Sequence, residues 1–202
     1  MAKRRLTQKE RKQETRQMLL ESAAETFAQL GFHGASVDKI AEFAGFSKGA
    51  VYAHFESKEE LFLALLEQQI QSHVNLIHEV WSEQQSFDHV IENIDDYFHL
   101  VSKKSRVWSI LSMEFLLYAM RDESVRKKWA ALIIESVDKI SKIIGKMMSE
   151  KNHECTLSSE ELAWTILSLE NGMTIFSHIT GERTPPNLYG KALQNILRQD
   201  IS

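Results

Sequence analysis

The sequence contains few of the residues that cross-link chains or interrupt helices. Its 202 residues include one cysteine, two prolines and eight glycines. A single cysteine, Cys155, excludes an intrachain disulfide and favours a reducing compartment, so we expect a cytoplasmic protein. The scarcity of helix-breaking residues favours a mostly helical fold. No run of about 18 apolar residues occurs, so we expect no segment that spans a membrane.

The net charge of −4 conceals an uneven distribution. Residues 1–54 carry nine Lys and Arg against six Asp and Glu, whereas residues 55–202 carry 15 against 22. Seven of the basic residues lie within the first 16 positions. A basic segment joined to an acidic remainder indicates an anionic partner for the N-terminal part, with a solvated basic tail as the alternative.

Apolar residues recur at helical spacing along most of the chain. We expect helices over residues 13–30, 37–44, 48–55, 58–82, 86–101, 105–120, 123–149, 158–180 and 187–200. The pattern shows no strand alternation, no internal repeat and no low-complexity segment. The sequence therefore predicts an all-α fold.

Local signals mark where several of these helices begin and end. Gly31 and Gly45 follow the first two helices and can take the left-handed conformation that terminates a helix. Serines precede the next helices and are suitable N-caps. The capping-box pattern, in which Ser is followed three residues later by Glu, occurs at Ser57–Glu60 and at Ser158–Glu161.

Residues 37–54 have the spacing of a helix-turn-helix. Ala41 is the small residue needed where two short helices cross, and Gly45 allows the tight turn between them. The seam would be filled by Ile40, Phe46 and Val51. Such a unit places its second helix in the major groove of DNA.

The start of this second helix lacks large side chains. Gly49 and Ala50 would allow close approach to base edges and phosphates. Polar residues surround this bare patch, and we expect them to contact DNA, chiefly its phosphates: Ser36, Ser47, Lys48, Tyr52, His54 and Lys58. The alternative for Tyr52 and His54 is packing between helices alone.

The segment SVDKIAEFAGFSKGAVYAHFESKEEL, residues 36–61, resembles the signature of the tetracycline-repressor (TetR) family. The preceding AAETFAQLGFHG resembles that family's first helix and loop, so the similarity covers about residues 13–62. The resemblance implies DNA-contact roles for the residues just named, Gly49 and Ala50 included. It also implies a three-helix DNA-binding domain over residues 1–56, with a basic tail at 1–12, and a larger helical ligand-binding and dimerisation domain over 57–202.

The function implied by the resemblance is transcriptional regulation. A homodimer would bind an inverted-repeat operator in double-stranded DNA and repress transcription until a small molecule bound in the C-terminal domain releases it. The residues that set sequence choice vary across the family, so no operator sequence follows. Activation instead of repression is possible, because that depends on where the operator lies relative to a promoter.

The last two expected helices are candidates for the dimer interface. The segment ELAWTILSLENGMTIFSHI, residues 161–179, is apolar nearly all round, so both of its sides must be covered. Gly172 would allow close helix crossing. Candidate interface residues are Trp164, Leu167, Gly172, Ile175, Leu193, Ile196 and Leu197. A single large monomeric core is the alternative.

Methionine and aromatic residues concentrate in RVWSILSMEFLLYAM, residues 106–120. Such side chains line adaptable apolar cavities, although they also fill cores. A lipophilic inducer could bind among Trp108, Met113, Glu114, Phe115, Tyr118, Asn171, Met173 and Phe176. Glu114 would lie either at a rim or inside the cavity, where it could meet a cationic ligand.

No pattern of an enzyme is present: there is no nucleophile elbow, phosphate loop or pair of catalytic carboxylates. His153 and Cys155 are too few to make a convincing metal site. We therefore expect no catalysis, no cofactor and no bound metal. A helical scaffold or interaction protein without DNA binding is the alternative function, and the intact Gly45, Lys48, Tyr52 and Lys58 argue against it.

Overall fold

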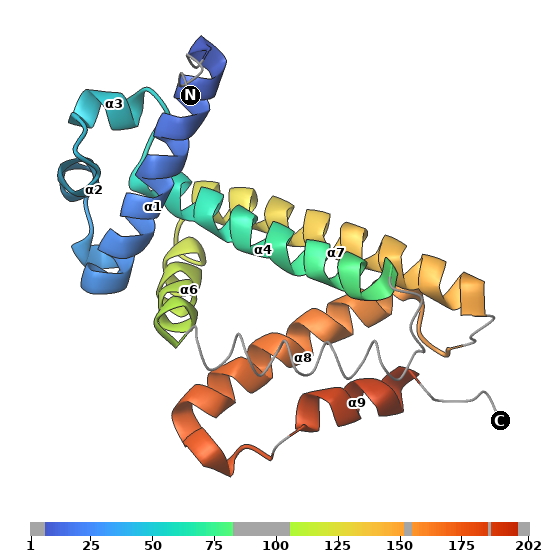
Figure 1. Cartoon of the computed structure of the whole chain (residues 1–202). Coiled ribbons are helices and arrows are strands. Elements are labelled where there is room, and N and C mark those ends of the chain that lie inside the picture. Colours follow the sequence, from blue (N-terminus) through green and yellow to red (C-terminus); the bar gives the residue numbers. More distant parts are fainter. Residues whose placement is uncertain (1–6, 83–105, 152–154, 186, 198–202) are drawn as a thin grey trace, which may run out of the picture. The chain divides into compact units, whose positions relative to one another are not determined.

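The structure, a computed structural model, describes residues 7–82, 106–151, 155–185 and 187–197. Regular structure in these ranges is helical, which confirms the all-α prediction (Figure 1). The elements are α1 (Gln8–Gly34), α2 (Val37–Ala44), α3 (Lys48–Tyr52), α4 (Lys58–Ser82), α6 (Arg106–Ala119), α7 (Glu123–Lys151), α8 (Ser159–Thr180), the 3-10 turn η1 (Gly181–Arg183) and α9 (Leu188–Leu197). The helix expected at 86–101 lies outside the described residues.

Helix α1 begins at Gln8, earlier than the expected Gln13, so residues 8–12 of the predicted basic tail are helical. A capping box that the sequence reasoning overlooked explains this start. The Thr7 hydroxyl accepts from the Glu10 amide at 3.2 Å, and the Glu10 carboxylate accepts from the Thr7 amide at 2.7 Å. Near the other end, Gly31 has the non-helical backbone angles φ 71° and ψ 169°, so it interrupts the helix where the sequence predicted a break, before the short last segment of α1.

The turn between α2 and α3 has the predicted geometry. Gly45 takes the left-handed conformation, with φ 68° and ψ 26°. The buried residues Ile40 and Val51 hold the two helices together. Helix α3 is shorter than expected and ends at Tyr52, so His54 lies just beyond it. We call α1, α2 and α3 together the head.

The chain divides into two compact units. The first comprises residues 1–69 and 110–129, and the second comprises 70–109 and 130–202. Helices α4, α6 and α7 each contribute residues to both units. The first unit thus extends well past the head, and the predicted domain division between residues 56 and 57 stays a prediction.

An aromatic cluster forms the core of the first unit. Phe27, Phe32, Phe62 and Phe115, from α1, α4 and α6, are fully buried. Their neighbouring ring centroids lie between 4.4 Å (Phe62 to Phe115) and 5.8 Å (Phe27 to Phe32) apart. Aromatic pairs at these distances contribute about 0.5–1.5 kcal/mol each beyond the burial of their surface.

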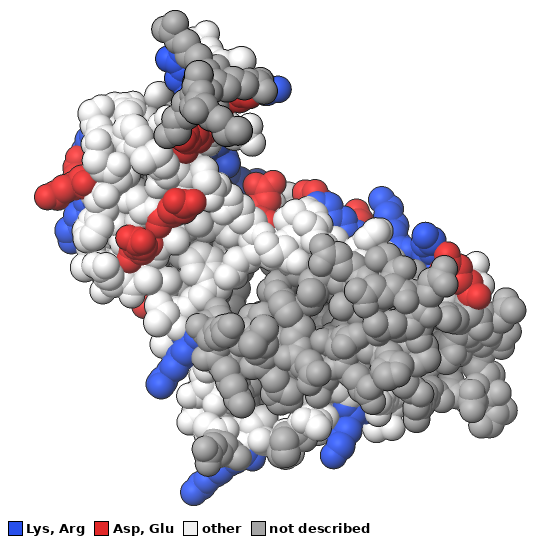
Figure 2. All heavy atoms as spheres, in the orientation of Figure 1, with Lys and Arg blue, Asp and Glu red and all other residues white. Residues whose placement is uncertain are grey.

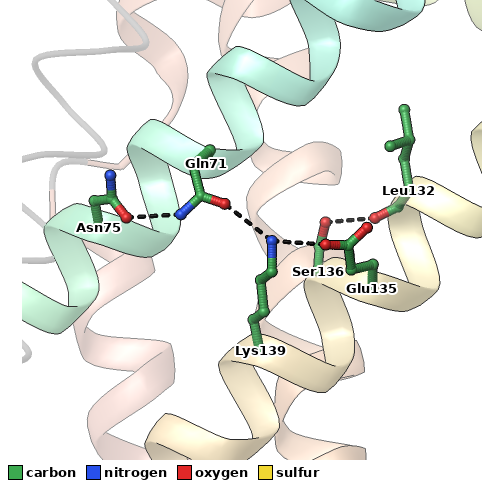
Figure 3. Close-up of polar contacts among 6 residues, drawn as sticks. All are labelled: Gln71, Asn75, Leu132, Glu135, Ser136 and Lys139. Atoms are coloured by element: carbon green, nitrogen blue, oxygen red, sulfur yellow. Dashed lines mark hydrogen bonds and ion pairs between the residues drawn. The ribbon is translucent and has the colours of Figure 1, made fainter.

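The second unit has a separate aliphatic core contributed by α4, α7, α8 and α9: Val74, Val137, Ile140, Ile144, Leu162, Ala163, Tyr189, Leu193 and Leu197. A polar bridge joins α4 to α7 (Figure 3): the Lys139 amine donates to Gln71 at 2.9 Å and pairs with Glu135 at 2.8 Å. Such solvent-accessible pairs contribute at most about 1 kcal/mol, so the apolar core accounts for most of the stability. None of the described helices is long and apolar enough to cross a membrane.

Candidate nucleic-acid interface

One edge of α3 is open. A Cβ atom built on Gly49 would meet only the Ser47 hydroxyl, at 3.9 Å. Tyr52 is 49% exposed, whereas Val51 between them is fully buried. The helix therefore packs through one side and leaves its glycine edge free, as a helix that enters a DNA groove must.

Ser36 and Ser47 are the N-caps of α2 and α3, as predicted. The Ser36 hydroxyl accepts from the Lys39 amide at 3.3 Å, and the Ser47 hydroxyl accepts from the Ala50 amide at 3.2 Å. A hydroxyl that accepts one bond can still donate its own proton. Both side chains can therefore cap a helix and donate to a phosphate oxygen at the same time.

Lys48 lies at the start of α3 and is paired with Asp38 of α2. The distance between the Lys48 amine and the Asp38 carboxylate is 2.8 Å, and both side chains are exposed. The hydrogen bond and negative charge of Asp38 raise the pKa of Lys48. A phosphate would have to share the amine with Asp38 or displace it.

The Lys58 amine is used within the protein. It donates to the Phe32 carbonyl at 2.9 Å and to the Ala35 carbonyl at 3.3 Å, and it lies 4.5 Å from the centre of the Phe32 ring. Two of its three donors are thereby engaged at the end of α1. Its predicted phosphate contact would require the third donor or a change in these bonds.

Glu114 and its neighbours on α6 lie in the first unit and pack against the end of α1. The Phe32 amide donates to the Glu114 carboxylate at 2.8 Å. Phe115 and Tyr118 belong to the aromatic cluster, with centroids 5.0 Å and 5.1 Å from that of Phe32. These three residues therefore stabilise the first unit, and their role as pocket residues stays a prediction. Met113 beside them is partly buried.

His54 lies partly buried next to the first turns of α1. Burial lowers its pKa, and the positive charges of Lys12 and Arg16 lower it further. The Arg16 guanidinium lies 4.9 Å from the centre of the Phe55 ring. Sequence reasoning did not single out Lys12 and Arg16, although their helical spacing was a readable signal.

The other predicted pocket residues belong to the second unit. Trp108 and Met173 are partly buried, and Met173 packs against the aliphatic core. Asn171 is exposed and donates to the Leu167 carbonyl of its own helix at 2.8 Å. Phe176 is 63% exposed, so it faces away from the protomer's interior.

Two titratable residues of α8, Glu170 and His178, were not among the site residues predicted from the sequence. Burial raises the pKa of Glu170 to about 7. The Nε2 atom of His178 is buried without a hydrogen-bond partner among the described residues, and burial together with nearby Arg106 lowers the pKa of His178. The available signal was that Glu170 is the only carboxylate between Leu162 and His178. Perturbed pKa values concentrate at functional sites, so both are candidates for ligand contacts.

The predicted dimer residues separate into two groups. Leu193 and Leu197 are buried in the protomer's own core, which corrects their assignment to the interface, and Ile196 and Leu167 pack partly against the same core. Trp164 is 43% exposed, a Cβ on Gly172 would meet nothing within 4 Å, and Ile175 is partly buried. An apolar face of α8 is thus open in the single chain.

Comparisons with known proteins agree with this geometry. Residues 19–65 match the family described as bacterial regulatory proteins, tetR family. The transcriptional activator FasR of Mycolicibacterium smegmatis is 45% identical over 62 residues, which cover 31% of this chain and 28% of FasR. The transcriptional repressor AcnR of Corynebacterium diphtheriae is 31% identical over 114 residues, which cover 56% of this chain and 55% of AcnR. The matches therefore span about half or less of these relatives.

The fold is shared over nearly the whole chain with solved structures. The regulator FadR of Bacillus subtilis, solved in complex with stearoyl-CoA, superposes with a TM-score of 0.70 and 17% identity, covering 90% of this chain and 97% of FadR. At this identity the likeness concerns the fold alone. Residues 19–65 thus match the DNA-binding domain of the tetR family of bacterial regulatory proteins, and the all-helical architecture of the chain is that of solved regulators of this kind.

Proposed function

We propose that the protein is a repressor that binds an inverted-repeat operator as a homodimer and is released by a small apolar molecule bound in its C-terminal helices. The observation that carries the DNA-binding part is the open edge of α3 at Gly49, which lies within the matched residues 19–65. A packed edge at Gly49 would have left no surface to enter a groove.

Dimerisation is supported by the open face of α8. Trp164, Phe176 and Ile179 are 43%, 63% and 75% exposed. Gly172 on the same helix would let a partner helix approach closely. Exposed apolar residues gathered on one face mark interaction sites in soluble proteins. A dimer also presents two recognition helices to successive major grooves, which an inverted repeat requires.

Release by a ligand is supported by the relatives and by α8. FadR of B. subtilis was solved with stearoyl-CoA. In this chain, α8 combines partly buried apolar residues with Glu170 and His178, whose pKa values are displaced by burial. An apolar site with a few polar groups suits a lipophilic molecule that carries a polar end.

The proposal also specifies the direction of regulation, which is repression and not activation. AcnR is named a repressor, and FasR, which is more similar over a shorter stretch, is named an activator. We favour repression, because occupying a promoter requires only DNA binding, whereas activation also requires productive contact with the transcription machinery.

The test is to sequence the fragments of its own genome that the purified protein retains. We expect an enriched inverted repeat near promoters, and reduced transcription from such a promoter when the protein is added in vitro. A Tyr52→Ala variant should retain less DNA with the same helicity by circular dichroism. Recovery of no common sequence motif at low salt would overturn the proposal, and increased transcription would make the protein an activator.

A further inference from the structure

The cations of α2, α3 and α4 near the head are engaged within the protein. The Lys39 amine donates to the Gly34 carbonyl at 3.0 Å, the Lys48 amine pairs with Asp38, and the Lys58 amine donates to Phe32 and Ala35. By contrast, Lys9, Lys12 and Arg16 of α1 have no ion pair with any carboxylate that the structure describes. Among the described residues near the head, the positive charge without an ion pair therefore lies on α1.

These three cations share one side of α1. Positions 9, 12 and 16 are separated by three and four residues, the spacing that places side chains along a single helical face. The same spacing continues through buried residues of the helix, Leu20, Ala23 and Phe27. The basic face is thus the N-terminal continuation of the side of α1 that packs into the first unit.

The carboxylates of α1 lie on the opposite side. Glu10, Glu14, Glu21 and Glu25 follow one another at intervals of four, seven and four residues, about 100° to 160° around the helix from Lys9 at 100° per residue. Arg11, about 200° from Lys9, lies on the carboxylate side. The side that carries Lys9, Lys12 and Arg16 has no carboxylate among the residues of α1.

The basic face lies beside the end of α3. Arg16 stacks on Phe55, and the charges of Lys12 and Arg16 act on His54, two residues beyond Tyr52. Figure 1 shows α3 next to the N-terminal half of α1, and Figure 2 shows Lys and Arg atoms near the N-terminal end of that helix. A DNA backbone alongside α3 would therefore run close to these cations.

We propose that Lys9, Lys12 and Arg16 form a basic face that binds the sugar-phosphate backbone of DNA beside the groove entered by α3. The proposal rests on the proposed DNA-binding function and adds a second contact surface to the helix-turn-helix. Such contacts fix the position of the protein on the duplex without reading its sequence. They also make binding dependent on salt, because each neutralised phosphate releases counterions.

The test compares two double variants with equal loss of charge. Lys12→Gln with Arg16→Gln removes two cations from the basic face. The matched control, Lys128→Gln with Lys142→Gln, removes two exposed cations of α7 that likewise lack an ion pair among the described residues. Binding to a fluorescent random-sequence duplex of about three helical turns is measured over a series of salt concentrations.

We expect the basic-face variant to bind roughly tenfold more weakly at low salt, and its salt dependence to flatten by about 0.9 in the log–log slope for each phosphate that the variant no longer neutralises. The control should match the wild type. Arg16→Lys, which keeps the charge, should retain the wild-type slope. Circular dichroism and thermal unfolding establish that each variant is folded.

The possible outcomes distinguish a failure of the basic-face proposal from a failure of the proposed DNA-binding function. A wild-type protein that binds no duplex would remove the DNA-binding function itself. A wild type that binds, with a basic-face variant equal to the control, would leave the face merely solvated and overturn the inference. Weaker binding with an unchanged slope would overturn it too, because the loss would then come from altered packing at Phe55.

Discussion

At the scale of single residues, Phe32 is held through its amide, its carbonyl and its ring. Its amide donates to the Glu114 carboxylate, its carbonyl accepts from the Lys58 amine, and its ring is buried in the aromatic cluster. A negatively charged side chain thus binds the backbone amide of Phe32, and a positively charged side chain binds its backbone carbonyl. Because Phe32 follows the kink at Gly31, these bonds fix the direction in which the chain leaves α1 for α2.

Glu114→Ala should lower the free energy of unfolding by about 1–3 kcal/mol, because the Phe32 amide would lose its acceptor in a part-buried position. Glu114→Gln keeps an oxygen acceptor and should cost less. Urea unfolding of the three proteins measures the difference. Equal stability of the alanine variant and the wild type would show that the bond contributes nothing.

Glu170 should make stability depend on pH. Burial raises its pKa from the ordinary 4.5 to about 7, so between these values the folded state holds a proton that the unfolded state releases. Its contribution is complete below 4.5 and is lost as pH rises through about 7. Glu170→Gln has no proton to release and should therefore be more stable than the wild type at about pH 8, by at most about 3 kcal/mol, and little different near pH 4.5.

Thermal unfolding across this pH range tests the expectation, with exposed Glu160 of the same helix, changed to Gln, as the control. His54 and His178, whose pKa values are lowered, destabilise all three proteins alike as pH falls below 6.5, so the difference between variants isolates Glu170. A Glu170→Gln effect that did not vary with pH would contradict it.

At the scale of helices, α2 and α3 could be predicted from sequence because their signals are local. An N-cap serine and the left-handed Gly45 act within a few residues, and the structure has both. The packing of α6 could not be predicted, since Glu114 and Phe32 are 82 residues apart in the chain. A helix rich in methionine and aromatic residues can either fill a core or line a pocket. Only its tertiary contacts distinguish the two, and these cannot be read from the local sequence.

Gly49→Ala should separate stability from DNA binding. The added methyl group would meet only the Ser47 hydroxyl, at an ordinary contact distance of 3.9 Å, and alanine is favoured over glycine in a helix by up to about 1 kcal/mol. We therefore expect an equal or higher unfolding temperature together with weaker DNA binding, because the methyl group occupies the edge that approaches the bases. Gly145→Ala in α7 is the control, which should leave DNA binding unchanged. Full DNA affinity in Gly49→Ala would mean that this edge does not enter the groove.

At the scale of the whole molecule, the relation of sequence to structure differs between the two units. The head carries a strong local motif, whereas the second unit is defined by packing that sequence reasoning resolved only in part: the buried Leu193 and Leu197 were expected at a surface.

Phe176→Glu with Ile179→Glu should convert the expected dimer into a monomer, because two exposed apolar side chains of the α8 face would become charged. Sedimentation measures the mass, and the same variant should bind an inverted repeat less tightly. Leu117→Glu, at a residue that is 59% exposed on α6, is the control for adding charge to an apolar surface position. A monomeric wild type at micromolar concentration would remove the α8 interface.

The capped start of α1 affects both the rate and the affinity with which the protein could bind a DNA duplex. Thr7 and Glu10 cap the first helical turn, so Lys9 and Lys12 already lie on an ordered helix before DNA binds. A loose arm would have to surrender its backbone freedom at the moment of association, at roughly 1–2 kcal/mol for each residue ordered. In this protein the backbone of α1 is already ordered when the protein folds. The entropic cost of ordering it is therefore not subtracted from the free energy of electrostatic attraction when DNA binds.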